Sequence, residues 1–207
     1  MKLSIIVPVY NMAADGKLEY CLDSLVNQTI SDYEIIAVDD CSTDNSWDIL
    51  QSYAEKYPDK FHNIHSEVNK KQGGAKNIGM GLARGEWIGF IDSDDWITPD
   101  FYERLIRKGE ETGADMVGCD YHLTGEHSMK IGQVVPNNKP EQTGVLTREK
   151  YRSLILDSGS LVVKVYRREI VIDHKSRFPE GIFYEDNALA NSWMLRAHHF
   201  EYIPEPL

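Results

Sequence analysis

The chain of 207 residues has little positive charge, few cysteines and no long apolar run. It contains 22 lysines and arginines against 33 aspartates and glutamates, which gives a formal charge of -11. This balance argues against a nucleic-acid partner, because binding nucleic acid depends on basic side chains that neutralise phosphates. A small phosphate-bearing ligand remains compatible with it, provided that a metal ion supplies the positive charge.

The scarcity of cysteine and of apolar runs limits the compartment. Cys21, Cys41 and Cys119 are odd in number, far apart and without Cys-x-x-Cys spacing, which favours a reducing cytosol. No run approaches the roughly 20 apolar residues that span a bilayer. Residues 1–10 are typical of a strand rather than a signal peptide. We therefore expect a cytoplasmic protein without a transmembrane segment; association with the inner face of the membrane and homo-oligomerisation stay open.

Short apolar runs alternate with amphipathic segments, and internal repeats are lacking. The sequence predicts strands over 2–9, 34–38, 61–65, 87–91 and 114–121. It predicts helices over about 18–26, 46–57 and 72–85, the last ending at Gly85 as a left-handed cap, and a further helix that Thr98 and Pro99 begin. This rhythm indicates βαβ units and a mostly parallel sheet, hence an α/β fold.

The pattern changes after Thr124. Residues 124–144 are polar and without a period, which is typical of a lid or a disordered loop. Beyond it we expect a strand over 161–166 and a helix after Glu185 and Asp186. The end at Leu207 fits a cut in a longer protein as well as a natural terminus.

Two of the predicted strands end in clustered carboxylates. Asp39 and Asp40 follow one strand, and Asp92, Asp94 and Asp95 follow the other. The carboxyl ends of parallel strands meet at the edge of the sheet where ligands bind, so these acids should face one cleft. A cluster of oxygen ligands suits Mg²⁺ or Mn²⁺. The alternative is a strand-ending turn in which the aspartates cap backbone groups.

Four short motifs occur in order, and together they resemble family 2 glycosyltransferases. They are Ser4–Asn11, Val38–Asn45, Gly74–Gly79 and Ile91–Asp95, with further matches at Lys164–Arg168 and at Glu185 and Asp186. The resemblance implies the GT-A fold, a Rossmann-like, mostly parallel sheet flanked by helices, with a C-terminal acceptor-side subregion. Residues 1–121 would form the nucleotide-sugar-binding half of a single domain, 122–146 a flexible loop, and 147–207 the acceptor-side part.

The resemblance also implies how the donor would be bound. Asp40 matches the acid that accepts a hydrogen bond from the uracil N3–H of a UDP-sugar, with Asp39 beside it. Pro8, Tyr10 and Asn11 match the first loop that contacts the nucleotide. Cys41 stands where the family usually has glycine, which should alter a turn without removing a functional group.

The second group of implied roles concerns the diphosphate and its metal, Mn²⁺ or Mg²⁺. Asp94 matches a direct metal ligand, and Asp92 a ligand that lies close to the ribose. Asp95 would either ligate the metal or support a ligand. Lys76 matches a basic position near the nucleotide; a lysine exposed on a helix is the alternative.

The third group concerns transfer. Asp186 matches the general base that takes the proton of the acceptor hydroxyl, and the family inverts the anomeric centre. Glu185 would position or cap; a helix N-terminus carrying two acids is the alternative for the pair. The acceptor would be a carbohydrate or a lipid-linked glycan. The identity of the donor sugar and of the acceptor, which depend on residues 124–184, stays open.

Two other functions compete with a sugar transferase. A nucleotidyltransferase would normally carry a glycine-rich, basic phosphate loop after the first strand, where this chain has Tyr-Asn-Met-Ala-Ala over 10–14. A non-catalytic nucleotide-sugar-binding module of a larger protein is the second alternative. The intact Asp92, Asp94 and Asp186 argue against a loss of activity.

Overall fold

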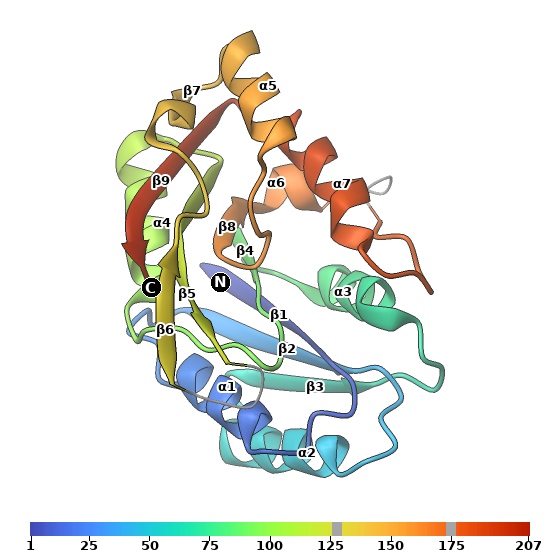
Figure 1. The fold of residues 1–207 in the computed structure, drawn as a ribbon. Coiled ribbons are helices and arrows are strands. Elements are labelled where there is room, and N and C mark those ends of the chain that lie inside the picture. Colours follow the sequence, from blue (N-terminus) through green and yellow to red (C-terminus); the bar gives the residue numbers. More distant parts are fainter. Residues whose placement is uncertain (126–129, 173–176) are drawn as a thin grey trace.

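The protein, described here as a computed structural model over residues 1–125, 130–172 and 177–207, is an α/β fold, as predicted (Figure 1). Its strands are β1 (Leu3–Val9), β2 (Tyr33–Asp39), β3 (Phe61–His65), β4 (Trp87–Phe90), β5 (Met116–Thr124), β6 (Ile131–Val135), β7 (Gly144–Val145), β8 (Lys164–Arg167) and β9 (His199–Pro206). Its helices are α1 (Lys17–Val26), α2 (Ser46–Lys56), α3 (Lys71–Leu82), α4 (Phe101–Thr112), the 3₁₀ helix η1 (Pro140–Gln142), α5 (Arg148–Leu156), α6 (Arg168–Val171) and α7 (Glu185–Met194). In these described ranges, none of the helices is both long and apolar enough to cross a bilayer.

The strands form one mixed sheet in the order β3-β2-β1-β4-β8-β5-β9-β7, with β6 paired to β5. Strands β1 to β4 pair in parallel, and so do β5 and β9. Strand β8 runs antiparallel between β4 and β5. The connections through α1, α2 and α3 are therefore the βαβ units that the alternating sequence predicts.

Helices cover both faces of the sheet, so its central strands are buried on both sides. Successive side chains of β1 point to opposite faces: Leu3, Ile5 and Val7 pack with α1 and α4, whereas Ile6 packs with α3. Figure 1 shows α1 and α2 on one side of β1 to β3 and α3 on the other.

The site lies where β1 and β4 separate. Their pairing ends at Ile6 opposite Phe90, so Pro8 lies beyond the ladder with β4 and its missing N–H interrupts no pairing there. Beyond Phe90 the chain turns into the segment that carries Asp92 and Asp94. The diverging chain ends leave a crevice at the carboxyl edge of the sheet, the usual place for a ligand in such folds.

Helix α3 is shorter than predicted, and Gly85 has a different role. The helix ends at Leu82, and Gly85 is not among the residues with positive φ. A Cβ on Gly85 would lie 2.4 Å from the backbone nitrogen of Ser4 and 2.7 Å from the carbonyl oxygen of Trp87. Glycine is needed here because backbones approach closely, and the prediction of a left-handed cap was wrong. Helix α4 likewise begins at Phe101 rather than at Pro99.

The region after Thr124 is more regular than predicted. It contains β6, η1 and the start of β7, and its Asn137 and Asn138 are buried. The prediction of no regular structure over 124–144 was therefore wrong for this part, while 126–129 lie outside the described residues. Flexibility of 122–146 stays a prediction. The strand expected over 161–166 is β8, which begins later.

Candidate active site

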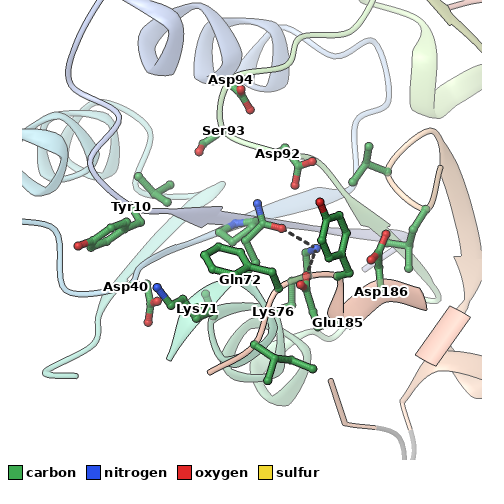
Figure 2. A pocket seen from close by; sticks show the side chains of 18 of the residues that line it. Tyr10, Asp40, Lys71, Gln72, Lys76, Asp92, Ser93, Asp94, Glu185 and Asp186 are labelled. Atoms are coloured by element: carbon green, nitrogen blue, oxygen red, sulfur yellow. Dashed lines mark hydrogen bonds and ion pairs between the residues drawn. The ribbon is translucent and has the colours of Figure 1, made fainter. Parts of the chain in front are cut away.

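A cavity of about 720 Å³ opens at the carboxyl ends of β1, β2 and β4 (Figure 2). Most of the predicted site residues line it, namely Pro8, Tyr10, Asp40, Lys76, Asp92, Asp94, Glu185 and Asp186. Its wall also includes Lys71 and Gln72 of α3 and two later segments, 160–162 and 182–184, which the motifs did not single out. From the sequence, these two segments belong only to the broad region 124–184, on which the identity of the donor sugar and of the acceptor is expected to depend.

The carboxylates of Asp92 and Asp94 lie on the same side of this cavity (Figure 2). Burial raises the pKa of Asp92; the ammonium of Lys76 opposes the rise, and the charges of Asp94 and of the two acids that begin α7 add to it. Asp92 Oδ1 is buried and, among the described residues, has no hydrogen-bond partner. Asp95 follows in the chain but does not line the cavity.

An unpartnered buried carboxylate oxygen among other carboxylates is a place where a cation fits. Within the described ranges, no three His, Cys, Asp or Glu side chains are arranged to hold a metal by themselves. Mg²⁺ and Mn²⁺ are often bound by only one or two carboxylates, with water and phosphate oxygens completing the set. Asp92 and Asp94 thus fit a divalent ion that the substrate helps to bind.

Lys76 is buried and paired, not exposed on its helix. Its Nζ donates to Glu185 Oε1 at 2.9 Å and to Gln72 Oε1 at 3.3 Å (Figure 2). The side chains of Lys76 and Glu185 are 4% and 5% exposed. The ammonium also lies 5.4 Å from the centre of the Phe178 ring. The pair therefore ties α3 to the first residue of α7, next to Asp186.

An aromatic cluster holds α7 in place. Trp193 stacks on Phe90 of β4 at 5.6 Å and meets Phe178 edge-on at 5.4 Å. Asn77 of α3 fixes the backbone of Phe178 from both sides, because its Nδ2 donates to the carbonyl oxygen and its Oδ1 accepts from the amide, each at 2.9 Å. The segment that leads into Asp186 is thus anchored to the same elements that carry the donor-side residues.

Asp40 lies at the end of the cavity opposite Asp186 (Figure 2). Its two carboxylate oxygens accept hydrogen bonds from the Lys70 amide at 2.9 and 3.1 Å. Burial raises the pKa of Asp40, and the backbone amides of Lys70 and Lys71 counteract the rise. Lys71 has φ +64° and places its Nζ 4.9 Å from the Phe183 ring across the cavity mouth.

Two predicted donor residues support the site from outside the cavity. Asp39 Oδ2 lies 2.7 Å from His65 Nδ1 and accepts from the Ser42 amide at 3.2 Å. Asn11 Oδ1 accepts from the Thr43 amide at 2.8 Å. Neither Asp39 nor Asn11 lines the cavity. Consecutive strand residues face opposite sides of the sheet, so Asp39 points away from the cleft that Asp40 enters.

The arrangement is that of a GT-A nucleotide-sugar transferase: a mixed sheet in which the carboxyl ends of the parallel strands β1, β2 and β4 open into one cleft lined by acids. The family model described as glycosyl transferase family 2 matches residues 4–174, and the chain belongs to that family.

The relatives agree with this assignment. The chain is 31% identical over 210 residues to the uncharacterized glycosyltransferase YibD of Escherichia coli, covering 100% of this chain and 60% of that protein. It is 45% identical over 185 residues to the poly(ribitol-phosphate) beta-glucosyltransferase of Bacillus spizizenii, covering 88% of this chain and 27% of that protein. The crystal structure of S. aureus TarS 1-349 with UDP-GlcNAc superposes with a TM-score of 0.80 at 27% identity, covering 99% of this chain and 56% of that one. The chain spans about 60% of the length of the first curated relatives.

Proposed function

We propose that this glycosyltransferase moves a sugar from a UDP-sugar to an acceptor hydroxyl, with inversion and with the help of a divalent metal. One observation carries the proposal: Asp40, the Asp92 and Asp94 pair, and Asp186 come from three distant parts of the chain and line one cavity. The UDP-GlcNAc complex of TarS supports a UDP-linked donor. The polymer named for the Bacillus spizizenii relative supports an acceptor in surface polysaccharide synthesis.

Asp40 is suited to select the base. A carboxylate has about four lone-pair sites. The Lys70 amide uses part of that capacity, so the carboxylate can also accept the uracil N3–H. Pro8 and Tyr10 line the cavity beside it and would enclose the nucleoside.

Asp94 and Asp92 would hold the metal. When bound, a divalent ion neutralises the charge that develops on the departing diphosphate. In the protein itself, burial raises the pKa of Asp92, and the ammonium of Lys76 opposes this rise and so favours the ionised carboxylate that a cation requires. Burial alone would push that acid toward its neutral form.

Asp186 would act as the base. Its carboxylate accepts the proton of the acceptor hydroxyl as the hydroxyl oxygen attacks the anomeric carbon. The bond between that carbon and the β-phosphate oxygen breaks, and its electron pair leaves with UDP. Glu185 pairs with Lys76, so we assign Glu185 to positioning α7. Asp186 lines the cavity, and we assign it to face the acceptor.

A screen for donor hydrolysis tests the proposal without knowledge of the acceptor. The protein is incubated with UDP-, GDP-, CDP- and dTDP-sugars, with Mn²⁺, Mg²⁺ or chelator, and the released nucleotide is measured. We expect slow, metal-dependent release from a UDP-sugar and its loss in Asp94→Ala. Release from no nucleotide sugar, together with no UDP binding, would overturn the proposal.

We also propose a cytoplasmic location, which the three free cysteines support.

A further inference from the structure

A cluster of buried polar side chains lies outside the acids described above. It consists of Asp120 on β5, Asn137, Asn138 and Gln142 between β6 and β7, and Lys164 on β8, each no more than 5% exposed. We call it the polar bracket. Buried polar groups are costly unless they are satisfied, so such a cluster needs a reason.

The polar bracket makes hydrogen bonds to the backbone of the segment that connects α5 to β8. Lys164 Nζ donates to the carbonyl oxygen of Ser158 at 2.9 Å and to that of Ser160 at 2.6 Å. Asn137 Oδ1 accepts from the Ser160 amide at 2.7 Å. Between them, Gly159 has φ +63°, and a Cβ there would lie 2.2 Å from the Asn137 carbonyl oxygen. These contacts constrain the backbone of Ser158, Gly159 and Ser160.

Further hydrogen bonds fasten the bracket to the sheet. The Asn137 amide donates to Asp120 Oδ1 at 2.9 Å, and the Tyr202 hydroxyl donates to the same oxygen. Gln142 Oε1 accepts from Asn138 Nδ2 at 3.2 Å. The bracket thus links the connection to β5, to β9 and to the segment between β6 and β7.

Burying the charged side chain of Lys164 at this position costs free energy of folding. Lys164 is 1% exposed, and in the described part of the chain its ammonium bonds carbonyl oxygens instead of a carboxylate. Burial lowers the pKa of Lys164 to about 7. An apolar side chain would fill the same space without that cost, but the Ser158 and Ser160 carbonyls would then keep only the side-chain amides of Asn138 and Asn137, each at 3.5 Å.

The segment held by these hydrogen bonds, residues 158–160, continues directly into the wall of the active-site cavity. Ser160, Leu161 and Val162 line that cavity, together with Asp186. In Figure 1 the orange connection from α5 descends to β8, beside β4. The residues proposed to bind UDP and metal lie at or just beyond the ends of β1, β2 and β4 and on α3, whereas residues 160–162 belong to the connection between α5 and β8.

We propose that the polar bracket sets the acceptor side of the active site, with Lys164 and Asn137 as positioning residues for the wall 160–162. The ligand there is the acceptor sugar: apolar Leu161 and Val162, with the 74% exposed Phe183 at the mouth, suit the C–H face of a sugar ring next to Asp186. This inference rests on the proposed function. It makes residues 137–142 an element of acceptor specificity, although they do not line the cavity.

The test separates acceptor binding from donor binding. Lys164→Met keeps the length of the side chain and removes its donors; Lys56→Met, at an exposed lysine of α2 outside the cavity, is the control. UDP affinity is measured by calorimetry with Mn²⁺, donor turnover by UDP release in water, and transfer with a panel of p-nitrophenyl monosaccharides. For Lys164→Met we expect an acceptor KM raised roughly tenfold or more. UDP affinity and water hydrolysis should stay within about twofold, and the control should match wild type.

A second variant keeps the test decisive if Lys164→Met does not fold. Val162→Trp leaves the bracket intact and fills the wall, so it should abolish transfer to the bulkier glycosides and spare UDP binding. Unchanged acceptor KM in both folded variants, or UDP affinity falling in parallel with transfer, would overturn the inference. If wild type neither binds UDP nor hydrolyses a donor, the proposed function itself fails, and that outcome is visible before any variant is made.

Discussion

Lys76 and Glu185 form a buried ion pair, with Nζ and Oε1 2.9 Å apart, between the helix beside the proposed donor site and the helix that carries the proposed base. Neither side chain has access to water that could replace its partner. Removing one of them leaves the other charge buried and unpaired, which is far more costly than breaking a surface pair. The pair is thus both a structural link and an electrostatic influence on Asp92.

We predict that Lys76→Met lowers the free energy of unfolding by roughly 3–5 kcal/mol, because Glu185 is then buried without a partner. Adding Glu185→Gln should recover part of the loss, since the second change removes the stranded charge. Urea unfolding of the two single variants and the double variant measures this coupling. Lys139→Met, which breaks the exposed pair with Asp157, serves as the control and should change little. Strictly additive effects would contradict the coupling.

We predict that UDP binds more tightly with Mn²⁺ or Mg²⁺ than with a chelator, by roughly tenfold or more. The reason is that the carboxylates at Asp92 and Asp94 would otherwise repel a diphosphate. In Asp94→Ala the affinity should no longer depend on metal, whereas Asp95→Ala, outside the cavity, should keep most of the dependence. Calorimetry with and without metal decides, and equal wild-type affinities would rule out the metal bridge.

We predict that Asp40→Ala weakens UDP binding by about 1–3 kcal/mol and reduces the preference for uracil, because the variant lacks the acceptor for N3–H. Competition among UDP, CDP and GDP measures the preference. The substitution also frees the Lys70 amide, so a thermal melt must show that the variant is folded. Asp59→Ala, at an exposed position away from the cavity, is the control. An unchanged nucleotide preference would leave Asp40 as a support for the Lys70 loop.

We predict that Asp186→Asn lowers transfer by roughly 10²–10⁴-fold while UDP-sugar affinity stays within a few-fold of wild type. The amide keeps the shape of the side chain but cannot take the proton. Glu185→Gln should reduce transfer less, and it should lower stability more because it disturbs the pair with Lys76. Single-turnover transfer and calorimetry on the same preparations separate these effects. Full transfer by Asp186→Asn would place the base elsewhere.

We predict that Lys164 makes the protein more stable as pH rises from about 7 to 8.5. Burial lowers the folded-state pKa of Lys164 to about 7. In this range the unfolded chain therefore holds a proton that the folded chain has released, and the free energy of unfolding increases with pH. The gain is at most about 2 kcal/mol over this interval. Urea unfolding at several pH values should show it in wild type and not in Lys164→Met; parallel curves would contradict the prediction.

The elements that local patterns define were predictable from sequence. Apolar runs located the parallel strands, and the rule that such strands present their carboxyl ends together brought Asp40, Asp92 and Asp94 into one cavity. The resemblance to the family added Asp186, which no local pattern connects to that edge. Cys41 has φ +64°, a conformation that glycine adopts easily and other residues rarely adopt. An altered turn at that position stays a prediction.

What sequence reasoning missed depends on distant contacts. Burial of Lys76 requires Glu185, which lies 109 residues away, so a lysine on a helix could not be distinguished from an exposed one. The position of Asn137 likewise depends on hydrogen bonds with Asp120 and Ser160, which a polar stretch without a period does not indicate. The need for glycine at position 85 comes from the backbone of Ser4 in β1 and of Trp87 in β4, and the local sequence favours a helix cap instead.

The position of β8 has a consequence for how the chain is made. Strand β8 pairs with β4 on one side and with β5 on the other, so β4 and β5 do not pair with each other. Both of them precede Lys164–Arg167 in the chain and are therefore synthesised first. Until then the nascent sheet has a gap at its centre and two open edges. The half that would hold the nucleotide therefore cannot reach its native sheet alone, and it becomes complete only when most of the proposed acceptor wall has left the ribosome.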